Sequence, residues 1–156
     1  MIGGRIYMWN ERKSILLSKI CLALFMALLL ACAILAPRLV RQLMWMSALA
    51  NSAGRALFLA TIYAGCVPAA ALLVCLFVLL RRIGAGNVFV SKNTACLRYI
   101  SWCCFAGAAI CLASALYYVP WLAIGVAAAF MGLVVRVIKN VVAKAIQLQD
   151  DADYTI

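Results

Sequence analysis

The chain has 156 residues, of which 69% are hydrophobic and only 12% are charged, and its mean hydropathy is +1.11. Soluble domains are about half apolar and roughly a quarter charged. A soluble fold of this size leaves too much surface exposed to hide so many apolar side chains. The composition therefore excludes an ordinary soluble domain and indicates that lipid is the solvent for most of the surface.

The formal charge of +10 comes from 14 Lys and Arg residues against 4 Asp and Glu residues. In a soluble protein this excess would suggest nucleic-acid binding. Here the basic residues stand at the ends of apolar runs, where they meet lipid headgroups and set the topology. We therefore expect no direct contact with nucleic acid.

Three uncharged apolar runs follow one another, over residues 20–37, 56–80 and 99–135. Crossing a hydrocarbon core of ~30 Å takes about 20 helical residues, so each of the first two runs provides one crossing. The third run is too long for one helix. Pro120 lacks a backbone N–H, and Tyr117, Tyr118 and Trp121 beside it are typical of the membrane interface. A tight hairpin at Pro120 is therefore predicted, and one helix kinked there is the alternative.

The sequence thus predicts one all-α domain over residues 1–156, a polytopic membrane protein with four transmembrane helices. The expected spans are about 15–36, 56–80, 97–118 and 121–140, with a tight outer hairpin between helices 3 and 4 and a tail at about 141–156. Eleven of the 14 Lys and Arg residues fall on the side that holds both termini. That side is expected to be cytoplasmic, because cytoplasmic segments are enriched in Lys and Arg.

The first span has a competing interpretation. Leu29 to Cys32, after a basic arm, looks like a lipoprotein signal in which Cys32 would be lipidated, and Ala31-Cys32-Ala33 has the form of an ordinary cleavage site. Apolar residues nevertheless continue to Ala36, and the charge balance fits four retained helices. We expect the span to be retained, with cleavage as the alternative.

The two longer connections differ in character. The outer one, residues 37–55, has apolar residues near helical spacing, which suits a short helix in the interface, an extension of span one or two, or a ligand-contacting lid. In the inner one, Gly84 and Gly86 indicate a turn after span two. Ser91 is a candidate N-cap for the third helix.

Residues that carry out catalysis or bind metals are missing from the spans. The chain has no His, its eight cysteines lie almost entirely in apolar runs without CxxC spacing, and no charged residue lies at mid-bilayer depth. We expect no enzyme activity, cofactor or metal. The polar residues within the spans are Thr61, Tyr63, Ser101 and Ser114. We expect their side chains to form hydrogen bonds within their own helix or between helices.

Small residues form faces on the last two spans, where they allow close helix approach. They are Cys103, Gly107, Cys111 and Ala115 on span three, and Gly125, Ala128, Ala129 and Gly132 on span four. Packing within one bundle is the favoured interpretation, and a homo-oligomer interface is the alternative.

Helix four is expected to continue as an amphipathic helix along the cytoplasmic surface of the membrane, and the segment ends with Asp150, Asp151 and Asp153, three of the four acidic residues. This acidic end has three possible arrangements: folded back onto the basic collar, presented to a cytoplasmic partner, or a solvated terminus.

Two segments carry a family resemblance: residues 86–93 with 97–101, and residues 150–156. They resemble a bacterial family of uncharacterised four-helix integral membrane proteins, which shows Gly, Phe, Ser or Thr and Asn before a Leu-Arg pair and closes on an acidic stretch ending in Thr-Ile. Lys92 and Tyr154 depart from that pattern, where the family often has an acidic residue and Leu.

Genes of that family often lie beside one for a small Xre-type helix-turn-helix regulator. The resemblance therefore implies a regulatory or sensory partner of a cytoplasmic transcription regulator, in the bacterial cytoplasmic membrane. The expected partner contacts are Phe89, Ser91, Asn93, Arg98, Asp150, Asp151, Asp153 and Ile156.

The expected contacts also have structural interpretations: Ser91 caps a helix, Phe89 anchors in the interface and Arg98 binds headgroups. Two other functions stay open. A small permease or exporter subunit would normally need an intramembrane charge. A self-immunity protein against membrane-active peptides is suggested by the small apolar bundle and its outer connection.

Overall fold

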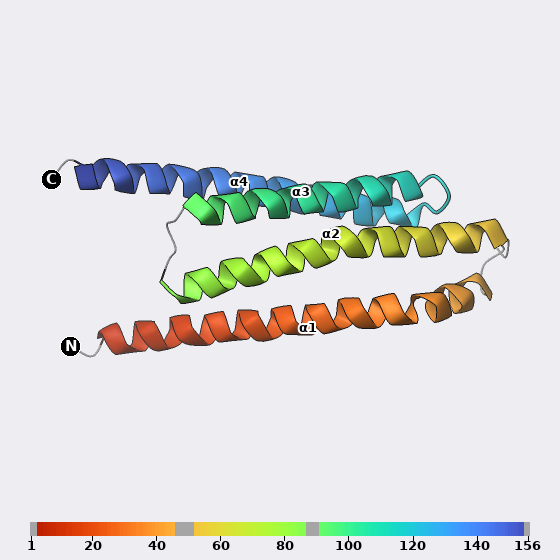
Figure 1. Ribbon diagram of the computed structural model, residues 1–156, viewed down its shortest axis with the longest axis horizontal. Helices are drawn as coiled ribbons and strands as arrows, with labels where there is room; N and C mark the ends of the chain where they lie inside the picture. Colours follow the sequence, from red (N-terminus) through yellow and green to blue (C-terminus); the bar gives the residue numbers. More distant parts are fainter. Residues whose placement is uncertain (1–2, 46–51, 87–90, 155–156) are drawn as a thin grey trace.

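The computed structural model describes the backbone of residues 3–45, 52–86 and 91–154 and the side chains of 13–42, 54–86 and 91–152. Four helices follow one another: α1 (Gly3–Trp45), α2 (Ser52–Gly84), α3 (Ser91–Ser114) and α4 (Pro120–Tyr154). They run alternately up and down one long axis, and both chain ends lie at the same end of the bundle (Figure 1). We call this the terminal end and the opposite one the hairpin end. The predicted all-α, four-helix architecture is confirmed.

Each helix contains a segment long and apolar enough to cross a membrane. The segments are Lys13–Gln42, Gly54–Gly84, Ser91–Ser114 and Pro120–Ala152, of 24 to 33 residues. Because about 20 residues suffice for a ~30 Å core, every helix has residues to spare. The chain is therefore a multi-pass membrane protein.

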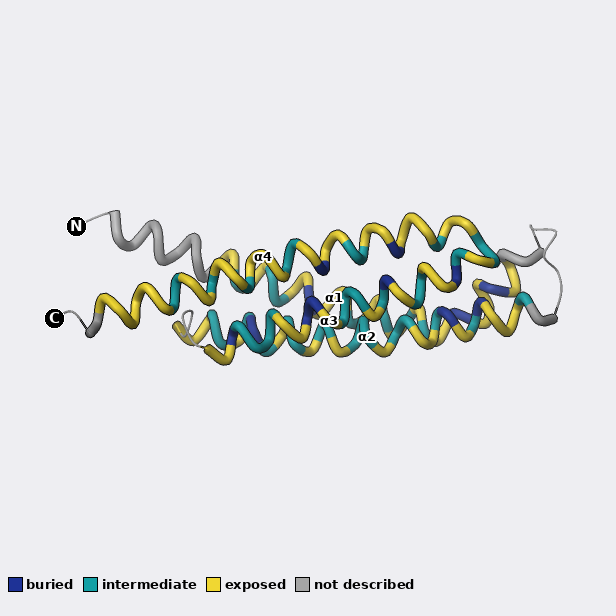
Figure 2. Tube along the Cα trace, turned by 90° about the horizontal axis from the view of Figure 1, so that it is seen from above, coloured by how far each residue is buried: buried dark blue, intermediate teal, exposed yellow. Residues whose placement is uncertain are grey.

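Exposed apolar side chains dominate the surface. Leu116 is 92% exposed, Ile34 76% and Val67 70%. Buried positions recur singly along the helices, between exposed ones (Figure 2). In water such a surface would be unfavourable, whereas lipid tails cover it at no such cost. The helices must therefore be held together by close packing and hydrogen bonds more than by burial of apolar area.

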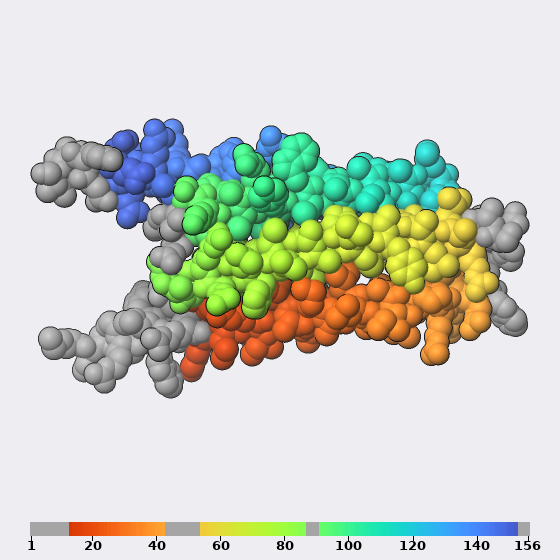
Figure 3. Space-filling view, viewed as in Figure 1, coloured from red at the N-terminus to blue at the C-terminus, as the bar shows by residue number. Residues whose placement is uncertain are grey.

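The helices pack in chain order, α1 on α2, α2 on α3 and α3 on α4. Within the described ranges, α1 and α4 make no helix–helix contact. The space-filling view shows α1, α2 and the α3–α4 pair as successive rows (Figure 3). The arrangement is therefore open between the first and last helices.

Two glycines bring α3 and α4 close together. A Cβ on Gly125 would lie 3.0 Å from Leu112 Cγ and 3.2 Å from its backbone nitrogen, and one on Gly132 would lie 3.2 Å from Cys104 Cβ. Ser101 Oγ donates a buried hydrogen bond of 3.0 Å to the carbonyl of Gly132. The expected packing of span four through Gly125 and Gly132 is confirmed.

The matching stripe predicted on span three lies differently. A Cβ on Gly107 would meet nothing within 4 Å, so the Gly107 position does not approach another helix in the described part of the chain. The α3 residues that meet the α4 glycines are Cys104, Phe105 and Leu112. Successive side chains point about 100° apart around the helix axis, so a stripe that begins one position later in the sequence lies on a neighbouring face of the helix.

Helix α1 continues through Pro37 to Trp45, so residues 37–45 extend span one and do not form a separate interfacial helix. Pro37 supplies no N–H to the carbonyl four residues earlier, that of Ala33. Tyr63 Oη on α2 donates to that carbonyl at 3.3 Å. A side chain from the neighbouring helix thus satisfies the carbonyl and allows proline inside a membrane helix.

Both turns lie where the sequence predicts them. The hairpin occupies residues 115–119, where the Tyr117 and Tyr118 amides both donate to the Ser114 carbonyl at 3.2 Å. At the terminal end, α2 ends at Gly84 and Gly86 has a φ of +83°, which glycine adopts without strain.

Helices α3 and α4 extend beyond the expected membrane spans at the terminal end. Helix α3 begins at Ser91, at the predicted cap position, and α4 continues to Tyr154, so the helix expected to continue past span four reaches the acidic end. Charge marks where a chain leaves the apolar core, but backbone hydrogen bonding continues beyond that point.

Candidate functional site

An aromatic cluster closes the hairpin end. Phe58 of α2 is only 6% exposed, and its ring meets those of Tyr117 at 5.3 Å, Tyr118 at 5.0 Å and Trp121 at 6.3 Å between centroids. The first two contacts are edge-to-face, an arrangement that aromatic pairs favour. Val40 of α1, 2% exposed, completes the core. The cluster ties α1 and α2 to the α3–α4 hairpin.

Three hydroxyls meet beside this cluster. Thr61 Oγ1 lies 2.7 Å from Ser114 Oγ and 2.5 Å from Tyr117 Oη. Thr61 also lies 3.1 Å and Tyr117 3.3 Å from the carbonyl oxygen of Leu57, and Ser114 lies 2.9 Å from that of Ile110. This hydroxyl network joins α2 to the end of α3 and the hairpin.

The three hydroxyls share their protons among five contacts. Three hydroxyls carry three protons, so they cannot make all these contacts at full strength at once. In one order that satisfies all three, Tyr117 donates to Thr61, Thr61 to Ser114 and Ser114 to the Ile110 carbonyl. In every order the contacts join the hairpin to α2 without a charged group.

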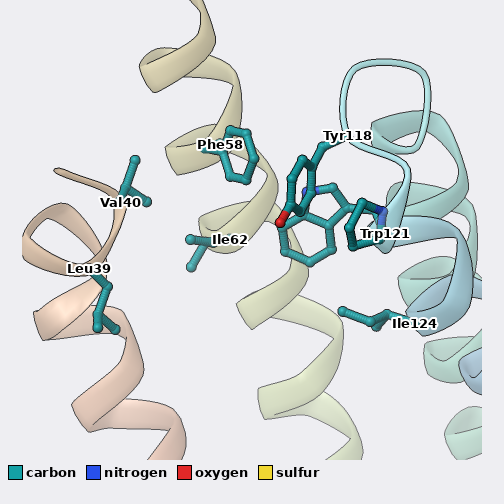
Figure 4. Close-up of a pocket in the computed structure, with 8 residues that line it drawn as sticks. Leu39, Val40, Phe58, Ile62, Tyr118, Trp121 and Ile124 are labelled. Atoms are coloured by element: carbon teal, nitrogen blue, oxygen red, sulfur yellow. The ribbon is translucent and has the colours of Figure 1, made fainter. Parts of the chain in front are cut away.

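A crevice opens next to the cluster, with a volume of about 290 Å³ (Figure 4). It lies among α1, α2 and the start of α4, where α1 and α4 do not pack together, and its side chains are apolar or aromatic. The size is near the lower end of ligand pockets, roughly 300–1,000 Å³. The lining residues are Leu39, Val40, Phe58, Ile62, Tyr118, Pro120, Trp121 and Ile124.

At the terminal end, polar contacts join α2 to the start of α3. Arg82 Nη1 donates to the Lys92 carbonyl at 3.3 Å and to Cys96 Sγ at 3.6 Å. Thr94 Oγ1 donates to the Ser91 carbonyl at 2.7 Å. Ser91 is the first residue of α3 and is exposed, and capping through its hydroxyl stays a prediction.

The predicted partner contacts of the inner connection divide by exposure. Arg98 is exposed, like Ser91, whereas Asn93 is only 2% exposed and is the least accessible of these three to a soluble partner. Phe89 lies outside the described residues.

The acidic residues lie on the last turns of α4. Asp150 and Asp151 are exposed; Asp153 belongs to the helix but its side chain is outside the described part, as is the whole of Ile156. Because Ser101 lies opposite Gly132 on an antiparallel helix, the start of α3 is level with about residue 142 of α4, and Asp150 lies roughly 12 Å farther along the axis. The described residues of the two predicted segments thus share one end of the bundle and are offset along its axis.

Two shallow grooves also lie toward the terminal end. One of about 490 Å³ follows α4 past Val137, Val141 and Leu148, which are more than 60% exposed, and past Asn140, Lys144 and Ala145. The other, about 320 Å³, is lined by Phe77, Val78, Arg81, Arg82 and Ala85 of α2. Among the described side chains, no group of three or more Cys, Asp or Glu is placed to hold a metal ion.

Four membrane-length helices, joined at one end by a hairpin under an aromatic cluster, define a polytopic α-helical membrane protein. Residues 17–156 match the family described as "Protein of unknown function (DUF2975)", and the chain belongs to that family. No curated protein and no solved structure matches the chain. The resemblance to an uncharacterised family is thereby confirmed.

Proposed function

We propose that the protein is a non-enzymatic regulatory membrane protein that binds a cytoplasmic helix-turn-helix transcription regulator through the end of α4. The observation that supports this role most strongly is the continuity of α4, one helix of 35 residues from Pro120 to Tyr154. Such a helix is about 52 Å long, whereas the hydrocarbon core is about 30 Å thick. More than ten residues therefore project beyond the core, and the exposed Asp150 and Asp151 stand near the tip.

Charge favours a DNA-binding protein as the partner. Helix-turn-helix proteins bind phosphates through Lys and Arg residues. An acidic helix end offers carboxylates to that same basic surface. Val141, Ala145 and Leu148 line the groove on the projecting part of α4 and supply an apolar contact beside the acids. A regulator held there would be kept away from DNA.

The same helix also connects the two ends of the bundle. Its first residues, Pro120, Trp121 and Ile124, line the crevice, and its last turns carry the acidic residues. A continuous helix moves as a rigid element, so a change of packing in the crevice would shift or tilt the acidic end. This route would let an event within the bilayer alter how the regulator is held.

This role requires both termini to face the cytoplasm. The distribution of basic residues favours that orientation, because Lys and Arg predominate at the terminal end. The acids would then stand where a soluble regulator can reach them, in the cytoplasmic membrane of a bacterial cell.

The test is a pull-down from native membranes that compares the intact chain with one ending at Gln149. A third variant, with Asp150, Asp151 and Asp153 each changed to Asn, keeps the length and removes the charge, and Gln147→Ala is its control. Recovery of a small DNA-binding protein with the intact chain and the control, but not with the other two, would support the role. Recovery of only copies of the chain or other membrane proteins from every variant would contradict it and favour transport or assembly.

A further inference from the structure

We infer that the crevice at the hairpin end binds one acyl chain of an anionic phospholipid, whose phosphate is held by Arg55. This inference goes beyond the proposed regulatory role and does not depend on it. It rests on the shape of the crevice, the position of Arg55 and the distribution of charge along the chain.

The crevice fits an acyl chain in chemistry and in size. Phe58 and Ile62 of α2 line it on one side and Trp121 of α4 on another, with apolar or aromatic side chains throughout (Figure 4). Its side between α1 and α4 is not closed by helix packing in the described part of the molecule. About 290 Å³ accommodates part of one chain but not a whole phospholipid, so the headgroup must lie outside.

Arg55 stands where that headgroup would lie. Residues 55, 58 and 62 are three and four positions apart on α2, so Arg55, Phe58 and Ile62 share one helix face. At 1.5 Å per residue, Arg55 is about 4–5 Å nearer the start of α2 than Phe58 and about 10 Å nearer than Ile62. The guanidinium, which is exposed, is therefore on the membrane-surface side of the crevice.

Arg38 and Arg41 of α1 lie at the same end of the bundle but on another face of their helix. Both are exposed, and they stand on either side of the crevice residues Leu39 and Val40 in the sequence. Because successive side chains point about 100° apart around a helix, Arg38 and Arg41 are each turned about 150° from the mean direction of Leu39 and Val40. The planar guanidinium of Arg55 presents paired N–H donors that match phosphate oxygens, and its long side chain can reach the headgroup region while its stem stays in apolar surroundings. Arg55 is therefore the arginine that shares a helix face with the crevice.

No acid neutralises this group of arginines. The sequence contains no Asp or Glu between Glu11 and Asp150, and both of those belong to the terminal ends of α1 and α4. The hairpin end therefore attracts anionic headgroups, by about five-fold in binding for each arginine near the surface. An arginine-lined groove at the terminal end is a weaker candidate, because Arg82 already donates to Lys92 and Cys96.

Trp121, which lines the crevice, is the natural reporter. Replacing Trp9, Trp45 and Trp102 with Phe leaves it as the single tryptophan. This protein is reconstituted in phosphatidylcholine vesicles that contain a minor fraction of either brominated phosphatidylglycerol or brominated phosphatidylcholine. Bromine on an acyl chain quenches tryptophan at contact. We expect the brominated anionic lipid to reach half-maximal quenching at a several-fold lower mole fraction than the zwitterionic lipid.

Two kinds of variant distinguish recognition of the headgroup from binding of the acyl chain. Arg55→Gln should remove the preference for the anionic lipid, whereas Arg38→Gln, on a face of α1 turned away from the crevice, should keep it. Ile62→Phe narrows the crevice and should weaken quenching by both lipids. Equal quenching by the two lipids, a preference that survives Arg55→Gln, or unchanged quenching with Ile62→Phe would each overturn the inference. Circular dichroism confirms that each variant retains its helices.

Discussion

Tyr63 donates its hydroxyl proton to the carbonyl of Ala33, and Ala33 is the residue whose helical hydrogen bond Pro37 cannot supply. The contact joins α2 to α1 at a distance of 3.3 Å. In lipid, a carbonyl without a donor is costly because no water replaces it. The proline and the tyrosine therefore act as a pair, although 26 positions separate them in the sequence.

This pairing predicts that the loss of unfolding free energy caused by Tyr63→Phe depends on which residue stands at position 37. With Pro37 present, the change should destabilise the protein by about 1 kcal/mol, since the Ala33 carbonyl loses its donor. In a Pro37→Ala background, the new backbone N–H should restore the helical bond and make Tyr63→Phe nearly neutral. Unfolding free energies in mixed detergent micelles would measure the cycle. Equal costs in both backgrounds would show that the hydroxyl does not compensate for the proline.

The α3–α4 interface predicts that replacement by alanine destabilises the protein at one glycine and is tolerated at another. Gly125→Ala should destabilise by about 1–3 kcal/mol, because its Cβ would lie 3.2 Å from the backbone nitrogen of Leu112, which cannot rotate away. Gly107→Ala, where nothing lies within 4 Å, should be neutral or slightly stabilising because alanine favours helix. Thermal unfolding in mild detergent would compare the two. A larger loss at Gly107 would indicate that this position packs against a second copy of the chain.

The hydroxyl network predicts coupling between Thr61 and Tyr117. Thr61→Val keeps the shape of the side chain and removes the central hydroxyl, at an expected cost of about 1 kcal/mol. Tyr117→Phe should cost much less once Thr61 is already valine, because its proton acceptor is gone. A double-mutant cycle on unfolding free energies would give the coupling energy. Additive costs would mean that the two hydroxyls are independent.

Orientation in the membrane can be checked with a reporter enzyme that folds only outside the cytoplasm. We expect no activity when the reporter follows Ile156 and high activity when it is inserted between α1 and α2. The reason is the excess of Lys and Arg at the terminal end. The reverse pattern would place the acidic end of α4 outside and remove the basis for a cytoplasmic partner.

Retention of the first span predicts an intact mass of 16.9 kDa. Helix α1 passes through Cys32 without interruption, and Cys32 is exposed on its surface. Cleavage at the lipoprotein-like segment would instead give a protein shortened by residues 1–31 with an added lipid mass. Intact-protein mass spectrometry of the membrane-extracted chain distinguishes the two.

The number of helices and the hairpin at Pro120 could be predicted because both depend on local properties, the length of an apolar run and the missing N–H of proline. The contacts of polar side chains could not. Thr61, Tyr63, Ser101 and Ser114 stood out as polar positions within spans, but their partners depend on how each helix is rotated and in what register it packs. The same limit explains the expected stripe at Gly107, which is turned away from α4.

Function was less accessible to prediction than fold. The burial of the Asn93 side chain could not be predicted from the surrounding motif, because a polar residue at the start of a helix can be either buried between helices or exposed at the surface. The crevice depends on Leu39 and Trp121, more than 80 positions apart, lying near each other at one end of the bundle. Only the three-dimensional arrangement brings them together.

The packing of each helix against its predecessor has a consequence for biosynthesis. Every new helix leaving the ribosome finds its packing surface already in the membrane, since α2 needs only α1, α3 only α2 and α4 only α3 in the described part of the chain. Assembly can therefore follow the order of translation, without waiting for a distant segment. The aromatic cluster is the exception, because Phe58 waits for Trp121. The hairpin end therefore closes only after the start of α4 has been made.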